Sequence, residues 1–165
     1  MDDARGDRWD RRLTGITLTI NGALIHAEIL PRVHLADFLR EHCGLTGTHL
    51  GCEHGVCGAC TIRLNGAIVR SCLVLAVQAD GATIETIEGV TDSGEAQALQ
   101  DAFAARNALQ CGYCTPGMVI TALDFLANAP DRCDRSAIRA HLSGNYCRCT
   151  GYEAIIDAIA QVGCR

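Results

Sequence analysis

The sequence predicts an α+β fold in which a small sheet comes first and a group of helices follows. In the first half, apolar and polar residues alternate at ITLTI (16–20) and ALIHAEI (23–29), as they do in half-buried strands. From about residue 92 the apolar spacing changes to three or four, with Ala96, Leu99 and Phe103 in one run, which is typical of one helix face. Strands grouped before helices favour two subdomains.

Two hairpins and a short helix account for the first half. Asn21-Gly22 and Asn65-Gly66 each stand between alternating segments, and Asn-Gly is a preferred pair for two-residue hairpin turns. The second hairpin joins TIRL (61–64) to AIVR (67–70), and a further short strand is expected at ATIETI (82–87). A short helix between the hairpins is predicted by the spacing of Leu35, Phe38, Leu39, His42 and Cys43.

Capping signals mark the helix starts in the second half. Thr115-Pro116 predicts an N-cap followed by proline in the first turn. Thr150 and Glu153 have the spacing of a capping box. A third helix is expected around residues 136–142, ending at Gly144.

Length, charge and terminal sequence exclude several classes of protein. The 165 residues carry a formal charge of −5 and are 48% hydrophobic, so a globular core is expected and a cationic surface for nucleic acid is not. Residues 1–15 form a charged tail that we expect to be flexible, without the apolar run of a signal peptide, and no later stretch is long enough to span a membrane. We therefore expect a cytoplasmic protein without nucleic-acid or membrane partners.

The cysteines are the exceptional feature of the composition. There are 11 of them, and an odd, high count without a leader favours metal binding over a disulfide framework. Cys52, Cys57 and Cys60 have C-x4-C-x2-C spacing, and Cys72 follows the second hairpin. This is the spacing of plant-type 2Fe-2S ferredoxins, and the glycines between the cysteines allow backbone N–H groups to approach the sulfurs closely. A zinc site is the weaker alternative, because its usual pattern is two short pairs.

A second group of cysteines lies in the helical half. Cys111 and Cys114 precede one predicted helix, and Cys147 and Cys149 precede another. Helix N-termini carry partial positive charge and lower thiolate pKa values, which suits an anionic cluster. From this spacing alone, an iron-sulfur cluster and a zinc ion remain equally open.

Four segments together resemble the iron-sulfur subunit of molybdenum hydroxylases, the xanthine oxidase family. They are, in the same order, GCEHGVCGACTIRLNG (51–66), SCL (71–73), QCGYCTPGM (110–118) and LSGNYCRCTGY (142–152). The resemblance runs from about residue 16 to residue 160. It implies a β-grasp, plant-type 2Fe-2S ferredoxin-like domain at 16–90 and a helical 2Fe-2S-binding domain, a four-helix bundle, at 91–165. The change from strands to helices places a linker near 89–95.

The resemblance also implies a role for each matching cysteine. The first quartet would hold the 2Fe-2S cluster nearer the flavin, and the second quartet would hold the cluster nearer molybdenum. Gln110 and the Cys149 region would lie beside the pterin that carries the metal. The ligands of the two clusters would be Cys52, Cys57, Cys60 and Cys72, and Cys111, Cys114, Cys147 and Cys149.

Electrons would then pass from a molybdopterin centre through both clusters to FAD, and no residue of this chain would convert substrate. Molybdopterin, in its dinucleotide form, and FAD would be bound by a large subunit and a flavin subunit, in a heterotrimer or a dimer of heterotrimers. A free-standing ferredoxin and a zinc-stabilised interaction module are the alternatives. The remaining cysteines are expected to be a core residue (Cys43), a loop residue (Cys133) and a free terminal thiol (Cys164), and Arg148 is either solvated or a counter-charge for a cluster.

Overall fold

The computed structural model describes residues 12–164 of the chain. The expected flexible tail at 1–15 therefore falls largely outside the described residues. Its last two residues belong to the first strand, which begins at Thr14. Among the described residues, no helix is both long and apolar enough to cross a lipid bilayer.

The first half forms one mixed, five-stranded sheet with the strand order β2-β1-β5-β3-β4. The hairpins β1–β2 and β3–β4 are antiparallel, while β5 runs parallel to β1 and antiparallel to β3, so it joins the two hairpins. Both predicted hairpins are confirmed, and the fifth predicted strand, expected at 82–87, is shorter than expected. The strands are β1 (Thr14–Ile20), β2 (Ala23–Ile29), β3 (Thr61–Leu64), β4 (Ala67–Arg70) and β5 (Thr83–Glu85).

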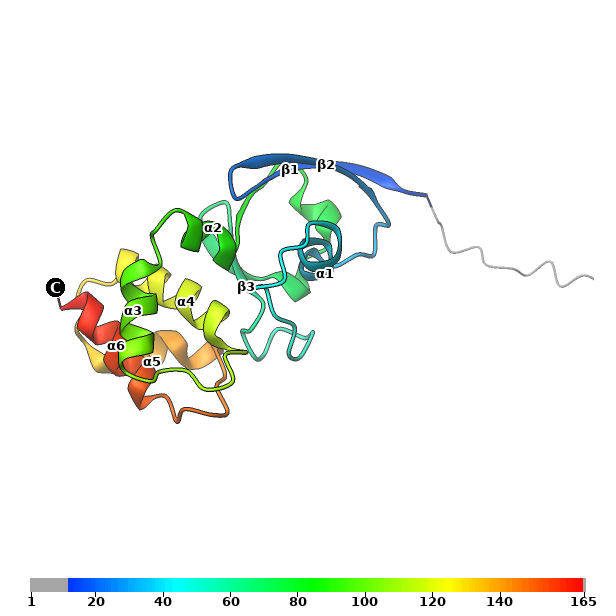
Figure 1. Cartoon of the computed structure of the whole chain (residues 1–165). Helices are drawn as coiled ribbons and strands as arrows, with labels where there is room; N and C mark the ends of the chain where they lie inside the picture. The colour runs from blue at the N-terminus through cyan, green and yellow to red at the C-terminus, as the bar shows by residue number, and fades with distance from the viewer. Residues whose placement is uncertain (1–11, 165) are drawn as a thin grey trace, which may run out of the picture.

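Asparagine and glycine at the hairpin turns adopt the left-handed backbone that such turns require. Asn21 and Asn65 have φ of 49° and 51°, and each is followed by glycine with positive φ. The inner face of the sheet packs against α1 (Leu35–Asp37) and its continuation Phe38–His42, over which β1 and β2 arch (Figure 1). The core between them includes Leu18, Ile20, Leu35, Phe38, Leu39, Ile62 and Ile84.

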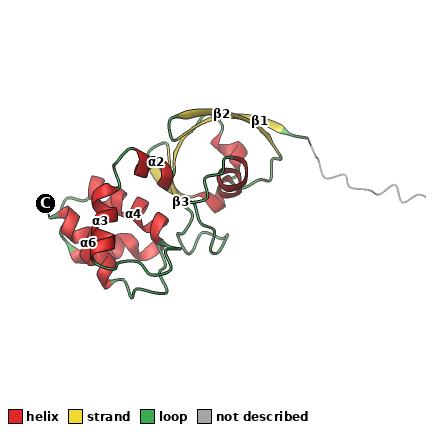
Figure 2. Cartoon of the chain, in the orientation of Figure 1, coloured by secondary structure: helices red, strands yellow, loops and turns green. Residues whose placement is uncertain are grey.

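The second half is helical and has a separate core. Figures 1 and 2 show α3 to α6 gathered on one side of the sheet domain. The core contains residues from each of these helices, among them Leu99, Phe103, Met118, Ile120, Ile138, Ile155 and Ile159. The helices are α2 (Ile87–Asp92), α3 (Gln97–Ala105), α4 (Thr115–Asn128), α5 (Arg135–His141) and α6 (Glu153–Gly163), with short 3-10 turns at Ser71–Leu73, Ala76–Ala79 and Leu142–Gly144.

Two helix starts differ from the predicted caps. Cys114, one residue before Thr115, is the N-cap of α4. At α6 the N-cap is Tyr152, in a left-handed conformation and without a side-chain cap bond. The predicted capping box is wrong because the helix begins at Glu153 itself, and the Glu153 carboxylate pairs with arginines of α5. The Thr150 hydroxyl accepts from the Tyr152 amide at 3.2 Å and lies 3.2 Å from Cys147 Sγ.

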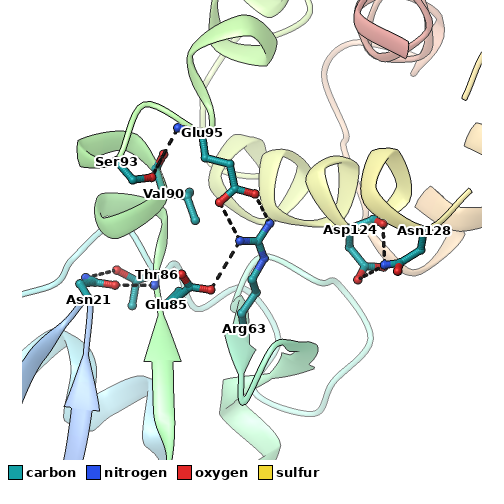
Figure 3. A network of polar contacts seen from close by, with 9 residues as sticks. All are labelled: Asn21, Arg63, Glu85, Thr86, Val90, Ser93, Glu95, Asp124 and Asn128. Carbon is teal, nitrogen blue, oxygen red and sulfur yellow. Dashed lines mark hydrogen bonds and ion pairs between the residues drawn. The ribbon is translucent and has the colours of Figure 1, made fainter.

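Helix α2 occupies most of the predicted linker and contacts both halves (Figure 3). The side chain of Asn21, at the first hairpin turn, accepts from the Thr86 amide and donates to the Thr86 hydroxyl, both at 2.9 Å. On its other side, Val90 is buried in the core of the helical half. The predicted domain boundary at 90–91 falls inside this helix and remains a prediction.

A bidentate ion pair strengthens the same junction. Arg63 of β3 donates to the Glu95 carboxylate at 2.8 and 2.6 Å, and it also reaches Glu85 at 3.5 Å (Figure 3). Its hydrogen bonds to Glu95 raise the pKa of Arg63 and lower that of Glu95. The sheet is thereby joined to the segment between α2 and α3.

Cys133, expected as a loop residue, and Cys164, expected as a terminal thiol, are bonded to each other in the structure. Cys133 and Cys164 form a disulfide that ties the end of α6 to the loop before α5. The end of α6 and the loop before α5 come close because Gly163 packs directly on the Arg132 carbonyl, where a Cβ would have no space. Cys43 packs against the first core and is half-buried, as expected.

Candidate metal centres

The second hairpin brings the fourth cysteine of the first quartet to the glycine-rich loop. Thr61 and Arg70 are partners in the β3–β4 ladder, so Cys60 and Ser71 lie side by side just beyond it. The Ser71 hydroxyl and amide both donate to the Cys60 carbonyl, at 2.7 and 3.2 Å. Cys60 and Cys72 are both buried, at 2% exposure, in one small cluster with Ala36. Cys72, which is distant in sequence from the other three cysteines, thus completes the first quartet.

The backbone of the loop from 51 to 60 turns sharply around the cysteine sulfurs. Glu53, Gly55 and Gly58 all have positive φ. The Cys57 amide points at Cys52 Sγ, at 3.4 Å, and a Cβ on Gly51 would lie 3.0 Å from Cys57 Sγ. Backbone N–H groups directed at sulfur stabilise an anionic cluster, as predicted.

The glycines of this loop also serve contacts that the sequence did not reveal. A Cβ on Gly55 would lie 2.4 Å from Leu73, and one on Gly58 would lie 2.5 Å from the carbonyl oxygen of Gly144. Gly58 is therefore required by the helical half as well as by the sulfur loop.

The thiols of the first quartet differ in their acidity. Hydrogen bonds from the backbone N–H groups of Cys57 and His54 lower the pKa of Cys52 to about 6. Burial raises the pKa of Cys72 to about 12, and the neighbouring Cys60 thiol adds to the rise. Burial also raises the pKa of Cys57. Cys52 is thus set to ionise readily, whereas the raised pKa values of Cys57 and Cys72 favour the thiol form until a metal binds, because metal ligation requires the thiolate.

The second quartet is assembled from the start of α4 and the loop before α6. Cys149 Sγ lies 3.6 Å from Cys111 Sγ. Burial raises the pKa of Cys114 to about 12, and a hydrogen bond with the Cys147 thiol contributes. For Cys147, burial acts in the same direction, but hydrogen bonds from Thr150 outweigh it and the pKa is lowered. Cys114 and Cys147 lie inward, whereas Cys111 and Cys149 are exposed.

Gln110 is tied to this second group. Its side-chain amide donates to the Cys149 carbonyl at 2.9 Å, and the Gln110 side chain is exposed. The two residues expected beside the pterin therefore lie together on the surface. Arg148, between two of the cysteines, is exposed.

Each quartet has the donor set of a 2Fe-2S cluster. Four cysteine thiolates hold such a cluster, shared between its two irons. Among residues 12–164, no three His, Cys, Asp or Glu side chains converge on a point that could hold one metal ion. A cluster does not require that convergence, because each iron takes only two protein thiolates and completes its shell with bridging sulfide.

The two cysteine groups meet at a buried polar contact between the halves. The Tyr146 amide donates to the Cys57 carbonyl at 2.8 Å. Asn145, 2% exposed, donates to the Gly58 carbonyl at 3.1 Å and accepts from Thr121 of α4 at 3.2 Å. Gly117 of α4 packs on the Gly58 carbonyl, where a Cβ would lie 2.3 Å away. The sequence offered no signal for this contact except the small residues at its centre.

The fold and its two cysteine centres define a two-domain iron-sulfur protein. Comparison with family models agrees: residues 18–86 match the 2Fe-2S iron-sulfur cluster binding domain, and residues 86–160 match the 2Fe-2S binding domain.

Relatives narrow this class to one family. The chain is 53% identical over 150 residues to the caffeine dehydrogenase subunit gamma of Pseudomonas sp. (strain CBB1), covering 89% of each chain. It is 40% identical over 145 residues to the xanthine dehydrogenase iron-sulfur-binding subunit of Escherichia coli O157:H7, covering 87% of this chain and 91% of that one. The crystal structure of quinoline 2-oxidoreductase from Pseudomonas putida 86 matches with a TM-score of 0.84 and 55% identity, over 90% of this chain and 91% of the other.

The chain therefore belongs to the iron-sulfur subunits of the xanthine oxidase family of molybdenum hydroxylases. It is an electron-transfer component of a molybdenum-dependent oxidoreductase, as its sequence motifs predicted.

Proposed function

We propose that this chain carries two 2Fe-2S clusters and relays electrons from a molybdopterin centre on a large partner subunit to FAD on a second partner. Each cluster supplies a site that accepts one electron at a time. Cys52, Cys57, Cys60 and Cys72 hold the first, and Cys111, Cys114, Cys147 and Cys149 hold the second, within helices that we describe as a four-helix bundle.

The direct contact between the two cysteine loops carries this proposal. The Cys57 carbonyl accepts from the Tyr146 amide at 2.8 Å, so a ligand of the first centre is one hydrogen bond from the neighbour of Cys147. Gly58 and Gly117 allow the backbones to approach closely. A protein that merely stored two separate metal ions would not need its two sites joined in this way.

The exposures of the cysteines support a direction for the relay. Cys111 and Cys149 are exposed together with Gln110, and they offer a face to a partner that holds the pterin dinucleotide. On the first centre, Val56 and Leu73 are exposed, at 44% and 61%. We propose that this apolar edge faces the flavin subunit, in a cytoplasmic heterotrimer or a dimer of heterotrimers.

Isolation of the complex under anaerobic conditions tests the proposal. We expect iron and acid-labile sulfide in equal amounts, at two clusters per chain, and two distinct paramagnetic signals on reduction. Zinc without sulfide would instead establish an interaction module. Two clusters in a chain that purifies without larger subunits would establish a free-standing ferredoxin.

A further inference from the structure

One arginine contacts both cysteine loops. Arg70 is the last residue of β4 and precedes Ser71 and Cys72. Its guanidinium donates to the Thr61 hydroxyl at 2.6 Å, and Thr61 follows Cys60 directly. The other end of the guanidinium donates to the Gly144 carbonyl at 2.7 Å and to Asn145 Oδ1 at 3.2 Å.

These contacts place one positive charge between the two centres. Thr61 is adjacent to a ligand of the first centre, and Asn145 is two residues before Cys147 of the second. Asn145 is itself buried and bonded to the first loop through the Gly58 carbonyl. The guanidinium therefore lies in the interior contact between the loops, partly shielded from water.

No carboxylate of the described residues balances the charge of Arg70. Its three acceptors are neutral oxygens, and within residues 12–164 no Asp or Glu pairs with it. Arg63, also on the second hairpin, contrasts with it because Glu95 and Glu85 balance its charge. A shielded guanidinium is costly unless an anion compensates it.

We propose that Arg70 is a shared counter-cation for both 2Fe-2S clusters, which raises both reduction potentials and holds the two ligand loops together. This inference rests on the two-cluster function proposed above. Four thiolates leave each cluster with net negative charge, and net charge and hydrogen bonding set cluster potentials. Each reduction adds a negative charge, which a fixed cation between the clusters stabilises.

Three variants in the intact complex separate charge from packing. Arg70→Gln removes the charge, and Arg70→Lys keeps it while losing the forked hydrogen bonds. The double variant R63Q/E95Q is the matched control, because it breaks another contact between the halves without changing net charge. Both cluster potentials are measured by redox titration followed by electron paramagnetic resonance, and thermal unfolding is measured in parallel.

For R70Q we expect both potentials to become more negative, with a threefold to tenfold loss in each reduction equilibrium constant, where tenfold is about 59 mV for a one-electron couple. We expect R70K to keep potentials near the wild-type values while melting at a lower temperature. The control should melt at a lower temperature with both potentials unchanged. Lower stability of R70Q with unchanged potentials would overturn the proposal and leave Arg70 a structural residue.

The result stays decisive if R70Q does not assemble both clusters. Full cluster content in R70K with unshifted potentials then supports the role of charge. Loss of a cluster from R70K as well overturns it, because the forked geometry would be the requirement. Failure of the two-cluster function itself is seen separately, as wild-type complex that lacks one of the two signals.

Discussion

The backbone amide of Tyr146 donates a hydrogen bond to the carbonyl oxygen of Cys57, at 2.8 Å. Cys57 belongs to the sheet half and is a member of the first quartet. Tyr146 belongs to the helical half and directly precedes Cys147 of the second quartet. The contact is short because glycines lie on both sides of it, Gly58 in the loop and Gly117 in α4. Its position places the junction of the two halves beside both cysteine quartets.

Replacing one cysteine of each quartet should remove the clusters one at a time. In Cys57→Ser we expect loss of one paramagnetic signal with the other retained, and in Cys114→Ser the reverse, because the two quartets are separate donor sets. Spectra of the reduced complex measure this. Cys43→Ser is the control, since Cys43 packs against the first core away from both quartets. Loss of both signals from either single variant would contradict two independent sites.

Adding one methyl group at the junction should force the halves apart. A Cβ at Gly117 would lie 2.3 Å from the Gly58 carbonyl, which is backbone and cannot rotate away. We expect Gly117→Ala to destabilise the protein by about 1–3 kcal/mol, the usual cost of overpacking. Chemical unfolding measures the change, with Gly15→Ala as the control because no atom lies within 4 Å of its added Cβ. Equal stability of the two variants would show that α4 does not press on the loop.

Removing the buried amide of Asn145 should cost more than removing an exposed one. Asn145→Ala removes the interior hydrogen bonds that the Asn145 amide makes with the Gly58 carbonyl and the Thr121 hydroxyl, and it also removes one acceptor of Arg70. We expect a loss of about 1–3 kcal/mol. Asn128→Ala is the matched control, because Asn128 is exposed and, among residues 12–164, bonds only to Asp124 of its own helix (Figure 3). The change in stability for this control should stay within about 0.5 kcal/mol. Similar losses for both would refute a special role for the buried amide.

The Arg63–Glu95 pair should make stability depend on pH in the acid range. Arg63 lowers the pKa of Glu95 below its unfolded value of about 4.3. The stabilisation of the folded state by the Arg63–Glu95 pair is therefore complete above the unfolded pKa of Glu95. It is lost as the pH falls through the lower pKa of Glu95 in the folded state. Glu95 is 43% exposed, so screening limits the effect to about 0.2–1 kcal/mol.

Unfolding of wild type and Glu95→Gln at a series of pH values measures this contribution. We expect a difference at pH 6 that narrows below about pH 4.3. Glu41→Gln, at another exposed carboxylate, should show no such narrowing. A difference that persists unchanged into acid would mean that the ionised pair is not its source.

The Cys133–Cys164 disulfide should stabilise the end of α6. The bond spans 31 residues, and loop closure of that length corresponds to about 3–4 kcal/mol. We expect the double variant C133S/C164S to lose free energy of unfolding of that order. A reductant should lower the stability of the wild type to the level of the variant, and it should leave the stability of the variant unchanged. Peptide mapping after thiol alkylation checks the bond directly. Labelling of both residues in unreduced protein would show that they are free thiols.

The sequence by itself determined most of the strands and helices and the two cysteine donor sets. Alternation, the Asn-Gly pairs and the three-to-four spacing are local signals, and they predicted both hairpins and the helical half. The spacing of the first quartet pointed to a 2Fe-2S cluster, while the second remained ambiguous until four motifs were taken together. These signals work because a strand, a turn or a ligand loop depends on residues only a few positions apart.

Only the tertiary structure decided how the two centres meet. Asn145 and Gly58 are 87 positions apart, and no periodicity relates them. The same holds for Arg70 with Gly144, for Arg63 with Glu95, and for the two cysteines of the disulfide. The predicted capping box failed partly for this reason too, because Glu153 pairs with Arg135 and Arg139 of α5. Such contacts depend on how two cores pack together, which local sequence patterns do not encode.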